Sequence, residues 1–237
     1  MAISTNPLAW LRSVQPRRAI ALLLLLLPLT VGAQTVRDLW LSMPPSLAPY
    51  LNTSLRTQCL DFYDMHTDAQ TDNALKGKSR IDTLTSTFLA ATLSKAHTLQ
   101  MKLLPASGSA SGLGSSLGSG SSSSLSSCDS VLCVVRSWDG PKRDSEVQLF
   151  DRQWKPLQAP FTFSADSFVC RPDTMSEERF SRLVALLDPI MFSVSLSPAE
   201  NVLLVKLSPV VPNPEDEKAI EQILVQRKLK WDGKTFK

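Results

Sequence analysis

The sequence predicts an α+β fold in which an antiparallel sheet built of hairpins has about four helices packed beside it. Two observations predict this class. Short helical patterns stand near the start of the chain and again in its last third. Between and after them, apolar and polar residues alternate in short runs separated by turn sequences, which is typical of half-buried strands joined as hairpins.

The first segment has the pattern of a secretory signal peptide. Arg17 and Arg18 precede an apolar run, 19–29, and small residues follow it up to Ala33. The run is about a dozen residues long, whereas a membrane span needs about 20. We therefore expect cleavage between Ala33 and Gln34, and a mature protein in the periplasm or the extracellular space.

Removal of the signal peptide changes the charge balance. The whole chain has 25 basic and 22 acidic residues, and three of the basic ones, but no acid, precede the cleavage site. The mature chain then has 22 of each and a formal net charge of zero. Nucleic-acid binding loses its electrostatic support, and with no second long apolar run, no transmembrane segment is expected after the signal is removed.

Two helices are predicted at the start of the mature chain. The first has apolar residues at helical spacing between Val36 and Met43, with Thr35 and Asp38 placed as a capping pair and Pro44 after its end. The second is expected over 54–66. Its apolar face would carry Leu55, Cys59, Phe62 and Tyr63.

The pattern then changes to that of strands. The Thr-rich stretch 80–93 predicts one strand, 94–97 a turn, and 98–105 a half-buried strand with strict alternation. After a Ser/Gly-rich tract, 131–138 is apolar on both faces, as in a central strand, and 145–151 returns antiparallel to it.

The last third mixes helices and hairpins. A helix is predicted to begin at a capping pair of Thr174 and Glu177 and to end at Pro189, and residues 192–209 then read as a hairpin. The apolar face of that helix would carry Phe180, Leu183, Val184 and Leu187. A final helix is predicted to have Asn213 as its cap, with Pro214 at its first position. Its buried face would carry Ile220, Ile223 and Leu224.

The chain ends in a predicted tight hairpin. Asp232 and Gly233 form the turn, and Trp231 and Phe236 flank it. A weak internal repeat aligns 88–105 with 192–209 without gaps. It reflects either a duplication of a helix-plus-hairpin unit or the general similarity of Leu-rich hairpins.

The tract 107–127 contains twelve Ser and five Gly among its 21 residues. Such a composition predicts disorder. Strand patterns stand directly on both sides of it, and an isolated hairpin before it would be only marginally stable. We therefore interpret 34–237 as a single domain in which 106–127 is an expanded loop between two strands of one sheet, following the signal peptide at 1–33.

Only one region offers candidate catalytic or metal-binding residues. Asp61, Asp64 and His66 could serve acid–base chemistry, and Asp64, Asp68 and Asp72 would share a face and bind a divalent cation if the helix continued. The alternative is a solvated helix end. The other histidine, His97, is expected to be exposed in a hairpin turn. The sequence has no nucleophile elbow, phosphate loop, zinc-protease motif or dinucleotide-binding turn, and no cofactor is predicted.

Four cysteines remain after signal cleavage: Cys59, Cys128, Cys133 and Cys170. Their spacing contains no CxxC, so a zinc site is not expected. Cys59 lies on an apolar helix face and Cys133 inside a strand, so both fit core positions as well as a disulfide. The sequence leaves their pairing open.

Three segments together resemble one known family. They are "LWLSMPPSLAPYLNTSLRTQCLDFYD" (39–64), "DSVLCVVRSWDGPKRDSEVQLFDRQWKPL" (129–157) and "KWDGKTF" (230–236). They are similar to domain-of-unknown-function family 3256, exported proteins of Bacteroidales, over nearly all of the mature chain. The resemblance implies export and a class of organism, but no activity and no catalytic residues. The Ser/Gly tract departs from the usual family pattern.

Two functions follow from these observations. The first is a non-catalytic exported protein that binds a partner protein or an envelope component, which the missing catalytic motifs and the zero net charge favour. The second is a metal-dependent or acid–base hydrolase centred on Asp61, Asp64 and His66. The geometry of these side chains distinguishes the two.

Overall fold

The computed structural model describes residues 34–106, 130–158 and 161–237. The predicted signal peptide and Ala33 lie outside the described residues, and so does the tract 107–127; Gln34 is the first described residue. The helices are α2 (Val36–Ser42), α3 (Thr53–Asp64), α4 (Glu177–Ala185) and α5 (Pro214–Glu221), with a short 3₁₀ helix η3 (Ala165–Phe168). The strands are β1 (Thr71–Asp72), β2 (Lys78–Leu84), β3 (Phe88–Ser94), β4 (His97–Pro105), β5 (Ser130–Asp139), β6 (Arg143–Phe150), β7 (Pro156–Leu157), β8 (Phe192–Leu196), β9 (Val202–Leu207) and β10 (Arg227–Lys230).

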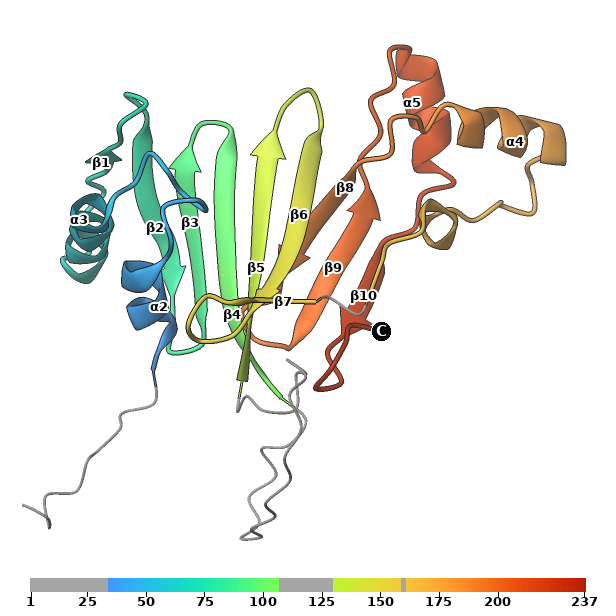
Figure 1. Ribbon diagram of the computed structural model, residues 1–237. Helices are drawn as coiled ribbons and strands as arrows, with labels where there is room; N and C mark the ends of the chain where they lie inside the picture. The colour runs from blue at the N-terminus through green and yellow to red at the C-terminus, as the bar shows by residue number, and fades with distance from the viewer. Residues whose placement is uncertain (1–33, 107–129, 159–160) are drawn as a thin grey trace, which may run out of the picture. The chain divides into compact units, whose positions relative to one another are not determined.

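The strands form two antiparallel sheets, which confirms the predicted α+β class (Figure 1). Strands β1 to β7 make a seven-stranded sheet in chain order, and β8, β9 and β10 make a three-stranded sheet with β9 in the middle. Strands β4 and β5 pair from His97–Trp138 to Pro105–Ser130. The chain on both sides of the Ser/Gly tract therefore belongs to one sheet.

The seven-stranded sheet has a hydrophobic core on each face, because its strands alternate between them. On one face, α3 lies against β1 and β2, and α2 lies against β3 and β4, with Trp40 and Leu39 completely buried. The indole Nε1 of Trp40 donates to the carbonyl of Arg56 at 3.0 Å, which joins the two helices. On the other face, β8 packs against β4, β5 and β6, and β9, α4 and α5 contribute apolar side chains to the same core.

Polar side chains of the large sheet hold the small sheet in place. The Lys102 ammonium is buried and donates to the carbonyls of Ser197 at 2.6 Å and Glu200 at 2.8 Å. Burial lowers the pKa of Lys102. The free edge of β8 is also capped, because its amides donate to side chains of β4 and β6. The amides of Phe192, Val194 and Leu196 donate to the side chains of Asp144, Ser145 and Gln100, at 3.3, 3.1 and 2.7 Å respectively.

Several predicted elements are present as expected. Asn213 caps α5 by accepting from the amide of Glu215, with Pro214 in its first turn. Trp231 and Phe236 form a bridge across the final turn, where Gly233 has φ 97°. Such a positive φ is open to Gly without steric cost.

Other expectations were wrong. The predicted strand 80–93 is two strands, β2 and β3, because the Thr85 hydroxyl accepts from the amides of Thr87 and Phe88 and closes a turn. Ser176, rather than Thr174, caps α4 and accepts from the amide of Arg179. The first copy of the possible repeat, 88–105, therefore follows strand β2, whereas a duplicated helix-plus-hairpin unit would have a helix there. Strand β10 was not predicted.

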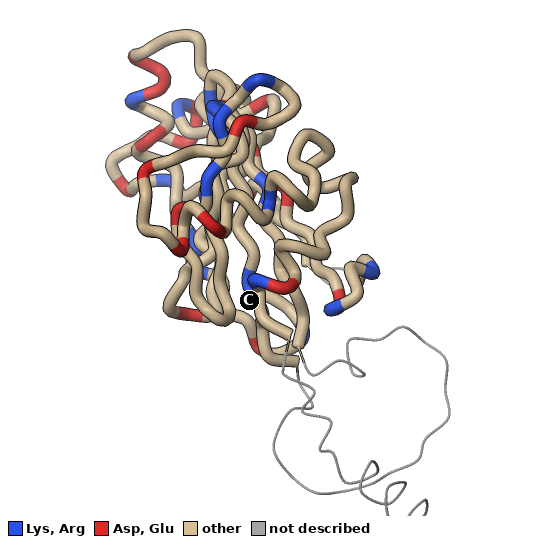
Figure 2. The backbone as a smooth tube through the Cα atoms, turned by 90° about the vertical axis from the view of Figure 1, so that its left-hand side faces the viewer, with Lys and Arg blue, Asp and Glu red and all other residues tan. Residues whose placement is uncertain are grey.

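In the described part of the chain, none of the helices combines the length and the apolar character needed to cross a membrane. Figure 2 shows Lys and Arg interspersed with Asp and Glu on the side that carries α3. Some of these charges form ion pairs, as in Arg37 with Asp64 at 2.6 Å and Lys78 with Asp72 at 2.5 Å.

Candidate functional site

The predicted acidic stripe is interrupted because α3 ends at Asp64. His66 has φ 52°, and its amide donates to the carbonyl of Tyr63, while the amide of Thr67 donates to the carbonyl of Phe62. This pair of bonds is a Schellman motif, in which the residue with positive φ terminates the helix. His66 thus has a structural position at the helix end, and the residues after it no longer follow the helical spacing.

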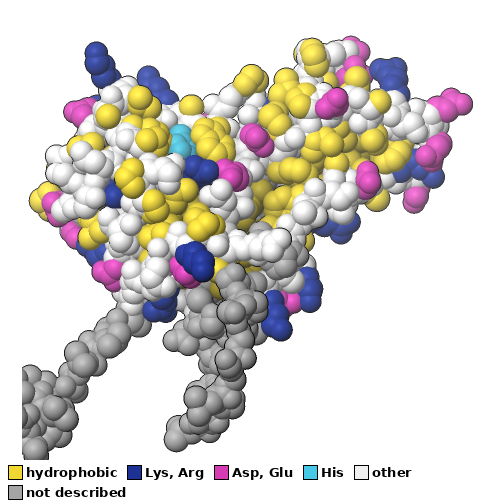
Figure 3. All heavy atoms as spheres, in the orientation of Figure 1, with side chains coloured by type: hydrophobic (Ala, Val, Ile, Leu, Met, Phe, Trp, Pro, Cys, Tyr) yellow, Lys and Arg dark blue, Asp and Glu magenta, His cyan; other side chains and the backbone are white. Residues whose placement is uncertain are grey.

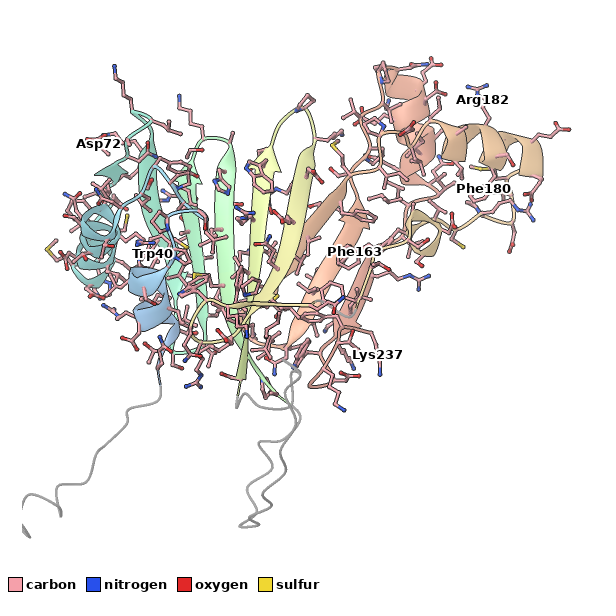
Figure 4. The ribbon with its side chains drawn as sticks, in the orientation of Figure 1. Trp40, Asp72, Phe163, Phe180, Arg182 and Lys237 are labelled. Atoms are coloured by element: carbon pink, nitrogen blue, oxygen red, sulfur yellow. The ribbon has the colours of Figure 1, made fainter. Side chains whose placement is uncertain are left out.

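The acidic residues consequently lie apart. Asp64 accepts two hydrogen bonds from the Arg37 guanidinium, at 2.6 and 2.8 Å, and this contact lowers the pKa of Asp64. Asp72 lies on β1, at the outer edge of the sheet, and pairs with Lys78 at 2.5 Å (Figure 4). Asp61 is exposed on α3. Among residues 34–106, 130–158 and 161–237, no three His, Cys, Asp or Glu side chains are grouped to hold a metal ion.

Two of the predicted residues, His66 and Asp68, line a polar groove of about 330 Å³ between the end of α3 and the outer edge of β2. The rest of the described lining includes Arg80 and Asp82, which form an ion pair at 2.7 Å. The Asp82 carboxylate also accepts from Thr92 at 2.7 Å. The charges of Arg80 and Asp82 in this groove are therefore paired with each other.

A second groove, of about 460 Å³, lies along the outer edge of β6. Its walls are mainly apolar, with the polar groups of Arg136 and Gln148 among them. This combination is typical of binding pockets. The lining comes from the segment after α2 (Pro44, Ser46, Leu47), from β5 and β6 (Arg136, Val147, Gln148, Leu149, Phe150) and from the region of β7 (Trp154, Pro156, Leu157).

The hydrophobic surface extends beyond this groove. Figure 3 shows hydrophobic side chains gathered over β8 and β9, and Figure 4 places Phe163 there. Phe163 is half-buried and contacts the rings of Phe161 and Phe192 at centroid distances of 5.6 and 5.4 Å. Large partly exposed apolar surfaces of this kind mark interaction sites.

An array of polar and aromatic side chains lies beside the groove, on the α2 and α3 face of the sheet. His97 was expected to be exposed, but only 8% of it is accessible. Its ring stacks on Trp138 at a centroid distance of 5.2 Å, and its Nδ1 is hydrogen-bonded to the Tyr50 hydroxyl. The guanidinium of Arg136 lies 5.4 Å from the Trp138 ring and pairs with Glu146 at 2.6 Å.

This array has two shifted pKa values with one main cause. Burial, together with the nearby charge of Arg136, lowers the pKa of His97, so the imidazole is neutral at pH 7. Burial raises the pKa of Tyr50 to about 12. Both side chains are therefore uncharged at neutral pH, and the pair joins the segment after α2 to the start of β4.

The two buried cysteines, Cys59 and Cys133, are protonated core thiols. Cys59, Cys133 and Cys170 are free thiols, and Cys128 lies outside the described residues. Cys59 and Cys133 are buried, as core positions would be, and burial raises the pKa of both thiols. A raised pKa keeps a thiol protonated and unreactive.

The comparisons with known proteins identify the family. The model of a family described as "Protein of unknown function (DUF3256)" matches residues 28–113 and 123–236. The chain belongs to this family. A solved structure, "Structure of a domain of an uncharacterized protein from Porphyromonas gingivalis W83", is 22% identical, with a TM-score of 0.64, and the match covers 86% of this chain and 99% of that chain. At this identity the likeness shows a shared fold. No curated protein matches the chain.

Proposed function

We propose that this member of the DUF3256 family is an exported protein that binds a partner polypeptide or envelope component and carries out no catalysis. The observation that carries the proposal is the groove beside β6, where apolar side chains from three parts of the chain surround a few polar groups. The pattern of a signal peptide at 1–33 supports export.

The hydrolase alternative has less support from the geometry. Asp64 is bound by Arg37, His66 terminates a helix, and Asp61 is exposed on α3. A general base must lie within hydrogen-bond reach of its substrate and be oriented by a neighbour. The β2 groove does not place these side chains in such an arrangement.

Photocrosslinking in the native envelope tests the binding proposal. A photoreactive amino acid at Ser46, which is exposed and lines the β6 groove, should capture a specific partner. The matched control carries the same probe at Asp68, which is exposed and lines the β2 groove. The same abundant bystander proteins at both positions would contradict the proposal.

Export is tested separately on the same tagged protein. The mature form should be recovered outside the cytoplasm, and its first residue by mass spectrometry should be Gln34. Recovery of the uncleaved chain in the cytoplasm would contradict export without bearing on the groove.

A further inference from the structure

The outer edge of β6 has backbone groups that no strand pairs with. Strand β7 is only two residues long and pairs with Leu149 and Phe150. The remaining six residues of β6, 143–148, pair with β5 on one side and are paired with no strand on the other among the described residues. Strand β8 lies against this stretch, where the Val194 amide donates to the Ser145 hydroxyl, but it forms no backbone ladder with β6.

The hydrogen-bond pattern shows which residues face outward. The amide of Asp151 donates to the carbonyl of Lys155, next to β7, so Asp151 faces away from β5. Backbone direction alternates along an antiparallel strand, so Leu149, Val147 and Ser145 face the same way. In the described part of the chain, no turn, loop or side chain contributes a hydrogen bond to the backbone amide or carbonyl of Val147 or Ser145.

The chain after β7 does not continue along this edge. By Phe161 it has reached the final hairpin, where the Phe161 ring meets the Phe236 ring at a centroid distance of 5.5 Å. The groove is lined by Val147, Gln148, Leu149 and Phe150, which are consecutive and alternate between the two faces of the sheet. Such a lining means that part of the open space lies beside the strand, while Leu47 and Arg136 line it on the α2 face of the sheet.

The other sheet edges are protected. Tyr63 caps β2, since its hydroxyl accepts from the amide of Leu84 at 3.1 Å. Side chains of the large sheet cap β8. Beside β10, Lys230 exchanges backbone hydrogen bonds with Lys237. An unprotected strand edge is a template for pairing with another chain.

We infer that the outer edge of β6 binds an extended segment of a partner polypeptide, which adds to the seven-stranded sheet as a strand in line with β7. The inference rests on the proposed binding function and specifies how the partner is held. Backbone hydrogen bonds to Val147 and Ser145 supply affinity, and the apolar walls select apolar side chains at alternate positions.

The test uses a synthetic peptide in which valine and threonine alternate, with lysine at both ends for solubility. Binding to the mature protein is measured by fluorescence anisotropy. A peptide of the same composition with proline at its central positions is the control, because it cannot pair as a strand. We expect the alternating peptide to bind and the proline peptide not to bind.

Two variants separate the strand mechanism from the groove itself. Val147→Pro removes the outward amide of β6. It should weaken binding of the alternating peptide by about tenfold or more, because roughly one backbone hydrogen bond to the peptide is lost and the neighbouring bonds are displaced. Leu47→Lys places a charge in the apolar wall and should weaken binding of any occupant. Loss of peptide binding in Leu47→Lys together with full binding in Val147→Pro would overturn strand addition and leave the proposed function intact.

Hydrogen exchange supplies a measurement that needs no variant. The amides of Val147 and Ser145 should exchange rapidly in the free protein and become protected when the alternating peptide is bound. Absence of peptide binding, or binding without protection of these amides, would overturn the inference. So would a dimer of the mature protein that Val147→Pro abolishes, because a second copy would then occupy the edge.

Discussion

At one edge of the seven-stranded sheet β1 pairs with two residues of β2, and at the other edge β7 pairs with two residues of β6. A groove lies beside each edge, yet the two differ in chemistry. The β2 edge has a register shift between Ile81 and Thr83, an ion pair between Arg80 and Asp82, and the Tyr63 cap on Leu84. Charges, irregular register and short strands are the devices by which proteins prevent edge pairing.

The β6 edge also carries charges, since Arg143 pairs with Asp139 and Glu146 with Arg136, but its register is regular and no hydroxyl caps its backbone among the described residues. Strand β7 covers the last two residues of β6, and Pro156 in β7 has no amide that could donate to a further strand. Earlier in β6, Val147 is half-buried and apolar, and the pairing of β5 with β6 is regular from Leu132–Phe150 to Asp139–Arg143. The two edges of the sheet therefore differ in their backbones: an irregular register and the Tyr63 cap close the β2 edge, whereas the regular register of β6 is suited to strand pairing.

Two proline variants of β6, which should differ strongly in stability, test which backbone amides face outward. Gln148→Pro removes an amide that faces β5 and should destabilise the protein by about 3 kcal/mol or prevent folding. Val147→Pro removes an outward amide and should cost about 1 kcal/mol or less, since proline is tolerated at such edge positions. Urea unfolding measures both. Equal losses for the two variants would mean that the outward side of β6 has been assigned incorrectly.

A smaller effect is expected at the β2 edge. Tyr63→Phe keeps the ring but removes the hydroxyl that accepts from the amide of Leu84 and donates to its carbonyl. The free energy of unfolding should fall by about 1–2 kcal/mol, because a partly buried amide loses its partner. Hydrogen exchange of Leu84 should accelerate while that of Thr83, which faces β3, stays unchanged. Unchanged exchange at Leu84 would show that the hydroxyl does not protect this edge.

The sequence predicted the elements that depend on local signals. Asn213 and Pro214 mark the start of α5, and the alternation in 98–105 marks β4, because caps and side-chain periodicity act over a few residues. The turn at Thr85 was missed because it contains no Gly or Pro. Its hydroxyl forms the turn through hydrogen bonds that a Thr-rich strand pattern conceals.

The candidate site was much less predictable. Burial of His97 depends on Tyr50 and Trp138, which lie far from it in the sequence. The open edge at Val147 depends on β7 ending after two residues, and strand length is not visible in the residues of β6. His66 and its neighbouring acids form a cluster in the sequence, but the Schellman motif at His66 separates them in the structure.

Protonation of His97 should make the stability of the protein depend on pH. The pKa of His97 is lowered by burial, so the unfolded state binds a proton first as the pH falls. The contribution of His97 to the free energy of unfolding is therefore fully present above about pH 6.5. It is lost as the pH decreases through the lower pKa of the folded state. His97→Phe should flatten this slope. Thermal unfolding of both proteins between pH 7 and 5 measures the slope; a slope that survives His97→Phe would assign it to another group.

The smallest effect is expected from Asp82→Asn. The Asp82 carboxylate accepts from Arg80 and Thr92 at a site where about half of the Arg80 side chain is exposed, and such pairs contribute about 0.5 kcal/mol or less. Urea unfolding should change little. The alternating peptide should still not bind beside β2, because the Tyr63 cap and the register shift remain. Peptide binding there, seen as new protection of the Leu84 amide in Asp82→Asn alone, would mean that charge rather than backbone capping distinguishes the two edges. The apolar character of the β6 edge would then be sufficient by itself to explain why that edge is open.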